Sequence, residues 1–368
     1  MSETTMKMQQ HKNLDVQSSA ERLGLNVVDV FSDIVQVTKE IEIELCGIAV
    51  ENELQQVITG SAGALLSASQ NNNGITTQER ALMEVQERVA IQFCINVLKA
   101  ETRRQNHSFS CFEKNIDEAQ GRYVLNPKFL FPSSSNPKMW EYSKSNGMAL
   151  HTSWESACLS AACELVERDM ILRAWFGESL PMLVNGFGGL DSEELNDFYE
   201  IYTLSFGKRT VVNLEKDLFV HGCFFIPKDK KYPFICGFGC ADSVGKSIIK
   251  AEQESLQRLG FLWDESLPLS LPNFMPHSGF HQEYYLFSGN HGVIRDFLLG
   301  KFFEKEKSKV FIKNPIKMEF FDLTPGFFGG DFYLAKATCD DCIPLIFGKT
   351  DIAPYDKLPE QRRIHLIS

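Results

Sequence analysis

The sequence predicts a mixed α/β fold built around three long helices. Apolar segments typical of β-strands, such as "DLFVHGCFFIP" and "YPFICGFG", alternate with segments whose apolar residues recur at helical spacing. The chain has 368 residues, of which 43% are hydrophobic, and this content is ample for a large core. We expect a mobile polar arm over residues 1–18 and a single domain over residues 19–368.

The expected elements follow one another in a clear order. Residues 25–50 read as short β-type runs broken by charged turns, and "SASQNNNGIT" reads as a loop. Helices are predicted at about Thr77–Leu98, Ser153–Phe176 and Val244–Trp263. Apolar strands fill much of the stretch between the second and third helices, and "MEFFDLT", "FYLAKAT" and "IPLIFG" are predicted strands near the C-terminus.

Charge and composition exclude several classes of protein. The 37 basic and 48 acidic residues give a net charge of −11, so the chain has no basic footprint for nucleic acid and is repelled by anionic lipid. The N-terminus lacks the apolar stretch of a secretory signal, and no run of about 18 apolar residues occurs. We therefore expect a cytoplasmic protein without nucleic-acid or membrane partners.

The ten cysteines are expected to be free thiols, because several lie inside apolar segments such as "ESACLSAAC". The single CxxC motif, Cys339 to Cys342, has no second CxxC or histidine pair that would complete a zinc site. Packing at a strand edge is the favoured interpretation, and half of a zinc site or a redox pair are the alternatives.

One five-residue pattern occurs on all three predicted helices. The segments "EVQER", "ELVER" and "ESLQR" begin at Glu84, Glu164 and Glu254, and each ends in arginine. Residues i and i+3 lie about 60° apart on a helix, so the first two segments present two carboxylates on one face. An ordinary surface ion pair between positions i and i+4, worth about 0.3 to 0.5 kcal/mol, would explain any single copy.

Small residues on the same helix faces favour a ligand site over surface ion pairs. Helical steps back from Glu164 and Glu254 reach Ala161, Ala157, Ala251 and Ser247, with Ser160 and Lys250 beside them. A groove that holds a ligand needs a low wall, whereas a solvated face more often carries long charged side chains. We therefore expect these small residues to line a groove.

Convergence of the three helices would require cations. Carboxylates about 5 Å apart repel by roughly 3 kcal/mol per pair at an effective dielectric near 20, so five glutamates cannot all stay ionised without compensation. Magnesium takes oxygen ligands and commonly bridges carboxylates to phosphates. Because the chain lacks a Walker loop and a Rossmann glycine fingerprint, the pattern predicts a Mg-nucleotide site without a conventional phosphate loop.

These motifs resemble those of a known family. "SNGMALHTSWESACLSAACELVERDMILRAWF" resembles the central signature of the YcaO family, "ITTQERALMEVQER" resembles its first glutamate helix, and "GFGCADSVGKSIIKAEQESLQR" is similar to its third element. "YVLNPKFLFP" is similar to the strand that precedes the central loop. The resemblance covers about residues 22–263 in the expected order.

The resemblance implies a YcaO-type fold with mixed sheets, in which glutamates from the three helices hold ATP and Mg2+. It implies ATP-dependent activation of peptide backbone amides, which yields azoline rings from Cys, Ser or Thr, or thioamides from external sulfide. The positions that match metal- or phosphate-facing acids are Glu84, Glu87, Glu164, Glu167 and Glu254. The positions that match nucleotide contacts are Arg88, Arg168, Lys250, Gln257 and Arg258. No catalytic residue is assigned.

Some positions depart from the family pattern. Asn73, Arg80, Thr152 and Ser156 replace the residues usual in the family, although Glu155 is retained, and the proline-rich tail common among azoline-forming members is missing. Two hypotheses follow: an active ATP-dependent enzyme, which the retained acids favour, and a subunit that no longer hydrolyses ATP and acts as a scaffold.

The resemblance also implies partners. A precursor peptide is the expected substrate, captured by a separate E1-like or leader-peptide-binding protein, since barely 20 residues precede the first family-like strand. A TfuA-like partner is the alternative that would accompany thioamide formation. A homodimer is compatible with the sequence.

Overall fold

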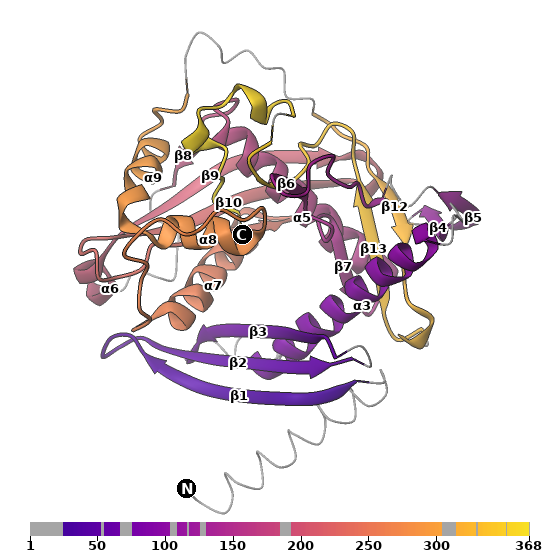
Figure 1. Cartoon of the computed structure of the whole chain (residues 1–368), viewed down its shortest axis with the longest axis horizontal. Coiled ribbons are helices and arrows are strands. Elements are labelled where there is room, and N and C mark those ends of the chain that lie inside the picture. The colour runs from indigo at the N-terminus through magenta and orange to yellow at the C-terminus, as the bar shows by residue number, and fades with distance from the viewer. Residues whose placement is uncertain are drawn as a thin grey trace, which may run out of the picture.

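The computed structural model describes residues 25–52, 55–66, 76–103, 109–115, 118–125, 130–184, 193–303, 314–328, 330–350 and 352–367. The predicted arm over residues 1–18 lies outside the described residues, and so does Asn73. The fold is mixed α/β, as predicted, with helices packed among antiparallel sheets (Figure 1). None of the described helices combines the length and the hydropathy that crossing a bilayer requires.

The N-terminal sheet lies between two helices. Its order is β1-β2-β3, and the strands are β1 (Asn26–Gln36), β2 (Glu42–Glu51) and β3 (Val57–Leu65). One face, with Cys46, Ile48 and Val50, packs against helix α3 (Thr77–Arg103). The other face, with Ile43 and Leu45, packs against helix α7 (Val244–Leu262). This alternation follows from the two-residue period of a strand.

Two larger sheets and helix α5 (Trp154–Trp175) form the rest of the core. One sheet has the order β11-β10-β9-β8, from β8 (Met182–Leu183), β9 (Tyr199–Val211), β10 (Lys216–Pro227) and β11 (Ile235–Ala241). The other has the order β5-β4-β12-β13-β7, from β4 (Phe109–Asn115), β5 (Glu118–Leu125), β7 (Met148–His151), β12 (Glu319–Asp322) and β13 (Tyr333–Thr338). Buried residues of α5 pack against both. Smaller elements complete the described fold: β6 (Trp140–Tyr142), β14 (Ile346–Gly348), α6 (Glu193–Phe198), α8 (Ser278–Leu286) and α9 (His291–Leu298).

The long helices begin where the sequence predicts. At the start of α3, Glu79 N–H donates to Thr76 Oγ1 at 3.2 Å, and Thr76 N–H donates to Glu79 Oε2 at 2.6 Å. This reciprocal capping box satisfies two backbone donors that a helix leaves free. Helix α5 begins after Ser153, whose hydroxyl accepts the Ser156 N–H at 3.2 Å. Local capping chemistry therefore sets both helix starts.

Glycines bring helices unusually close to strands. A Cβ on Gly237 of β11 would lie 2.4 Å from Ser255 N and 2.5 Å from Ala251 O of α7. A Cβ on Gly60 of β3 would lie 2.4 Å from Val85 N of α3. Because a side chain at either position would meet helix backbone, these glycines fix how closely α7 and α3 approach their sheets.

The prediction that small residues line a groove is wrong for four of them, which are fully buried. Ala157, Ala161, Ser247 and Ala251 each have 0% of their surface exposed. Ser247 and Ala251 pack with their backbone against the glycines of β11. Small side chains on these helices therefore permit close packing against a sheet, and they do not form a wall facing a ligand.

The described cysteines are thiols that form no disulfide. In the CxxC motif, Cys342 N–H donates to Cys339 O at 3.2 Å in the turn that follows β13. The next residue, Ile343, donates its N–H at 2.8 Å to Asp169 of α5. This turn therefore ties the C-terminal part of the chain to the central helix.

Candidate functional site

A cavity of about 720 Å³ lies where the N-terminal sheet meets α3, α7 and the start of α8. Figure 1 shows α3 and α7 converging on β3 from different parts of the sequence. The residues that line the cavity are Ser61, Ala62, Arg80, Glu84, Arg88, Glu254, Gln257, Arg258, Phe261, Leu262, Ser278 and Gln282. Five of the ten residues that the sequence predicts for the site line this cavity, and they come from helices about 170 positions apart in the chain.

The edge of β3 that faces away from β2 borders this cavity, and side chains satisfy its backbone groups. Ser61 N–H donates to Glu84 Oε2 at 2.8 Å, and Gln257 Nε2 donates to Ser61 O at 3.2 Å. Arg80 Nη1 lies 3.5 Å from Gly63 O. An open strand edge normally pairs with another strand or with water, but here residues of α3 and α7 cap it.

Four of the predicted glutamates accept a hydrogen bond from a strand backbone. Besides Glu84, the acceptors are Glu87 from Leu150 N at 2.9 Å, Glu164 from Met148 N at 3.0 Å and Glu254 from Phe238 N at 2.8 Å. The donors belong to β7 and β11. One carboxylate oxygen of each glutamate is therefore held by the sheet, which fixes the direction of the other oxygen.

The arginines at position i+4 take the second oxygen in all three copies of the pattern. Arg88 lies 2.6 Å from Glu84, Arg168 lies 2.6 Å from Glu164, and Arg258 lies 2.9 Å from Glu254. The ion pairs considered from sequence therefore form. They differ from ordinary surface pairs because the two pairs from α3 and α7 share one cavity and the third is largely shielded from solvent.

Each of the five predicted glutamates interacts electrostatically with at least one other glutamate of the set. Burial raises the pKa of Glu87 to about 7, and the nearby charges of Glu164 and Glu84 add to the rise. Burial raises the pKa of Glu167 to about 8, with Glu254 as the next cause and Glu164 also contributing. Interacting glutamates therefore connect α3, α5 and α7, and a bound positive charge would reduce the repulsion among these carboxylates.

The central part of the chain matches the sequence profile of a known family. The sequence profile described as "YcaO cyclodehydratase, ATP- and Mg2+-binding" matches residues 114–309, which is more than half of the chain. The chain belongs to the YcaO family. The family is described as ATP- and Mg2+-binding, so ATP and Mg2+ are the cofactors of this chain. The match begins after α3, so Glu84, Glu87 and Arg88 lie outside it.

A solved structure with a TM-score above 0.5 shows the same fold at low sequence identity. The Escherichia coli microcin synthetase McbBCD complex with pro-MccB17 bound contains a chain that is 11% identical, with coverage of 92% of this chain and 96% of that one and a TM-score of 0.53. YcaO from Methanopyrus kandleri, bound with AMPPCP and Mg2+, is 14% identical over 91% of this chain and 89% of that one, with a TM-score of 0.48. No curated protein matches the chain significantly.

The donor set of the cavity fits a magnesium ion that also has phosphate ligands. Across the described ranges, no three His, Cys, Asp or Glu side chains gather into a set that could hold a metal ion. Magnesium usually takes only one or two carboxylates and completes its shell with phosphate oxygens and water. Glu84 and Glu254, which share the cavity, meet this requirement.

The other predicted residues of this YcaO chain lie around the cavity lining. Arg168 Nη1 donates to Asn146 Oδ1 at 3.3 Å. Lys250 is exposed, and its Nζ donates to Cys240 O at 3.1 Å, beside Glu167. The predicted residues outside the lining are therefore Glu87, Glu164, Glu167, Arg168 and Lys250. Of these, Glu87 is an electrostatic neighbour of Glu84, and Glu167 is one of Glu254.

Sequence reasoning missed Lys336 of β13. Its side chain is buried, and its ammonium group donates to Asn146 O next to the central glutamate helix. Burial lowers the pKa of Lys336 to about 8, while Glu164 opposes the shift. Because Lys336 comes from the part of the chain where the family resemblance is loose, no local motif indicated it.

The substituted positions at the start of α5 lie outside the cavity lining. Thr152 and Glu155 are exposed, and Ser156 takes part in the helix cap. The departures of Thr152 and Ser156 from the family pattern therefore leave the lining residues unchanged.

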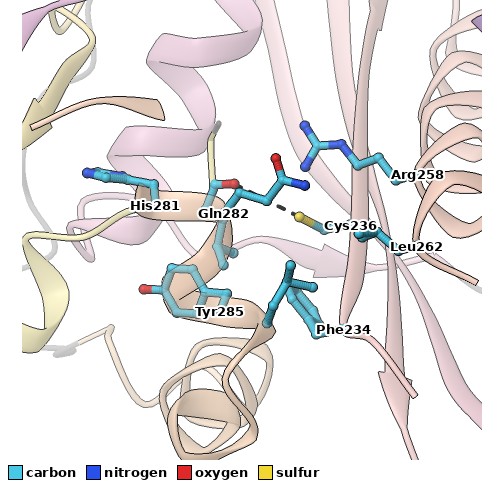
Figure 2. A pocket seen from close by; sticks show the side chains of 9 residues that line it. Phe234, Cys236, Arg258, Leu262, His281, Gln282 and Tyr285 are labelled. Carbon is cyan, nitrogen blue, oxygen red and sulfur yellow. Dashed lines mark hydrogen bonds between the residues drawn. The ribbon is translucent and has the colours of Figure 1, made fainter. Parts of the chain in front are cut away.

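A second, small cavity lies behind Arg258 (Figure 2). Its volume is about 20 Å³, enough for one water molecule. Arg258, Leu262 and Gln282 line both cavities, and Cys236 and Leu366 belong to the small one alone. Cys236 Sγ donates to Leu366 O at 4.0 Å, and burial raises the pKa of this thiol to about 12, so Cys236 is no nucleophile at neutral pH.

Proposed function

We propose that this YcaO chain uses ATP and Mg2+ to activate backbone amides of a ribosomally made peptide, with azoline formation at Cys, Ser or Thr as the reaction. The observation that carries the proposal is the shared cavity, whose lining includes Glu84 of α3, Glu254 of α7, three arginines and Ser61 at the edge of β3. The family description, which names a cyclodehydratase with ATP and Mg2+, supports it.

In this proposal the Arg88–Glu84 and Arg258–Glu254 ion pairs belong to the ligand-free state. Phosphate would replace the glutamates as partners of the arginines, and a cation would replace the arginines as partners of the glutamates. Arg88 and Arg258 are held by Glu84 and Glu254, and both arginines reach the cavity. A phosphate offers an arginine two parallel hydrogen bonds, as a carboxylate does. If Arg88 and Arg258 bound phosphate instead, one oxygen each of Glu84 and Glu254 would be available to hold a cation, and the strand N–H groups would keep each carboxylate in place.

Bound ATP and Mg2+ supply a phosphoryl group and charge neutralisation that make an amide oxygen a good leaving group. The side chain of Cys, Ser or Thr in the peptide adds to the preceding carbonyl carbon. The carbonyl oxygen departs as phosphate, a C=N bond forms, and the protons of the nucleophile and the amide are released. The residues of this chain bind and orient the reactants.

Two alternatives use the same cavity. Thioamide formation with a TfuA-like partner would replace the amide oxygen by sulfur from external sulfide. A non-hydrolysing scaffold subunit is favoured by one observation, the engagement of Glu84, Glu164 and Glu254 in ion pairs. In either case a separate E1-like or leader-binding protein would deliver the precursor peptide.

Reconstitution with candidate precursor peptides and the partner protein tests the proposal. We expect ATP hydrolysis that the peptide stimulates, together with loss of one water mass per azoline, and loss of both in Glu167→Gln. The matched control is Glu265→Gln, which changes an exposed glutamate just beyond α7. Exchange of oxygen for sulfur in the product would establish thioamide formation, and binding of MgATP without turnover would establish the scaffold.

A further inference from the structure

We propose that Arg80 is a phosphate-binding residue of this cavity. The inference rests on the proposed function and adds a residue to the same site. Arg80 lies on α3, one helical turn before Glu84, and lines the cavity with it. From sequence, Arg80 is one of the departures from the family pattern on which the scaffold hypothesis rests, and its placement in the cavity supports a role in binding instead.

Arg80 differs from the other arginines of the lining in its partners. Arg88 and Arg258 each form an ion pair with the glutamate one turn earlier. Within the described residues, Arg80 forms no such pair, and its hydrogen bond is the long one to Gly63 O at 3.5 Å. Glu84 acts on it only as a nearby charge. A guanidinium group has five N–H donors, so most donors of Arg80 remain available.

Partial burial makes this arrangement unfavourable without an anion. Burial lowers the pKa of Arg80, although Glu84 opposes the shift. A charged group that is removed from water is normally paired with an opposite charge or a strong acceptor. The cavity beside Arg80 is the open space from which such an acceptor can approach.

The charge of the lining favours a phosphate chain as that acceptor. Three arginines face two glutamates in the cavity, so the lining is net positive although the chain carries a net charge of −11. A positive cleft in an acidic protein attracts anions locally. Arginine binds phosphate through two parallel hydrogen bonds, which fits the donors that Arg80 has free.

Two substitutions separate charge from structure. Arg80→Gln keeps an amide donor for Gly63 O and removes the charge, whereas Arg80→Lys keeps the charge. The matched control is Arg295→Ala, which removes an exposed arginine paired with Glu200 outside the cavity. Binding of a fluorescent ATP analogue in the presence of Mg2+, with competition by ATP, inorganic triphosphate and adenosine, gives a readout that does not depend on activity.

We expect Arg80→Gln to weaken the binding of ATP and of triphosphate at least about tenfold, because it removes a hydrogen bond between charged groups, and to leave the binding of adenosine unchanged. Arg80→Lys should recover part of the loss, and Arg295→Ala should match the wild type. Wild-type binding of MgATP with no change in Arg80→Gln overturns this inference alone. Equal weakening of adenosine also overturns it, because that result indicates a structural role. Absence of MgATP binding in the wild type overturns the proposed function as well.

Discussion

Asp169 of α5 is a fully buried carboxylate with three partners. It pairs with Arg209 of β9 and with Arg173, and it accepts the Ile343 N–H at 2.8 Å. A buried charge is tolerated only when it is paired and hydrogen-bonded, so this carboxylate holds α5, β9 and the C-terminal segment together. Asp169 directly follows the "ELVER" segment and therefore positions the helix that carries Glu164 and Glu167.

Asp169→Ala should lower the free energy of unfolding by about 3 to 5 kcal/mol, because it removes the counter-charge of a buried arginine. Asp217→Ala is the matched control, because Asp217 pairs with Lys208 at the surface. This substitution should lower the free energy of unfolding by about 1 kcal/mol or less. Chemical denaturation of the purified variants measures both. Equal, small losses in the two variants would show that the buried pair does not hold α5.

At the scale of single residues, the sequence identified glutamates and arginines by their helical spacing, which is a local property. It missed Ser61 and Arg80, whose places at the cavity follow from the open edge of β3. It also did not indicate Lys336, which lies on a strand far along the chain, contacts Asn146 and is an electrostatic neighbour of Glu164. Local spacing reveals which face of a helix a residue occupies, but not which strand that face meets.

At the scale of elements, the position of α7 depends on glycine in β11. Gly237→Ala should displace α7 and with it Glu254, Gln257 and Arg258, because the added methyl group meets helix backbone. We expect lower stability, by about 1 to 3 kcal/mol, and weaker MgATP binding. Gly245→Ala on the same helix is the control, since a Cβ there has nothing within 4 Å and alanine favours the helix. Thermal unfolding and nucleotide binding of the pair check this; indistinguishable variants would contradict it.

The C-terminal segment is held by two buried histidines. Gly348 N–H donates to His281 Nε2 at 3.0 Å, so Nδ1 of His281 carries the proton that is donated to His365 O at 3.1 Å. His365 Nε2 lies 2.8 Å from Ile346 O. Both rings are accommodated as neutral groups, and Arg168 and His277 are the charged or titratable groups beside the pair.

The contribution of His365 to stability should therefore fall in acid. Burial lowers the pKa of His365 to about 4, so between pH 6.5 and 4 the unfolded chain binds more protons than the folded chain. As pH decreases through this window, His365 alone lowers the free energy of unfolding by up to about 3 kcal/mol, whereas Glu87 and Glu167, whose pKa values are raised, act in the opposite direction. His365→Gln should remove the contribution of His365 from the measured dependence. Denaturation measured from pH 7 to pH 4 tests this, and an unchanged slope in the variant would count against it.

The helices could be predicted from sequence and the sheets could not. Predicted helix starts at Thr77 and Val244 agree with α3 and α7, because caps and apolar spacing are local signals. The order β5-β4-β12-β13-β7 joins strands far apart in the sequence, and no local signal specifies such pairing. The small residues of α5 and α7 were misread for the same reason, since their partners are distant strands.

At the scale of the whole molecule, an acidic YcaO chain contains a cavity with a net positive lining. The sheet β1-β2-β3 lies between α3 and α7 and brings residues from both ends of the family-like region to one strand edge. The central helix α5 extends the series of acids beyond the lining. A site of this kind exists only in the folded chain, since no single segment supplies both its acids and the strand edge.

Calorimetric titration with ATP tests whether α3 and α7 share one Mg-nucleotide site. The proteins are the wild type, Glu84→Gln, Glu254→Gln and the double variant, each measured with Mg2+ and with a chelator. We expect binding that depends on Mg2+ and an affinity for ATP at least about tenfold lower in each single variant. The loss of affinity in the double variant should be smaller than the product of the two single losses, because both acids serve one ligand. Binding that is unaffected by either substitution, or losses that multiply independently, would contradict a single site shared by the two helices.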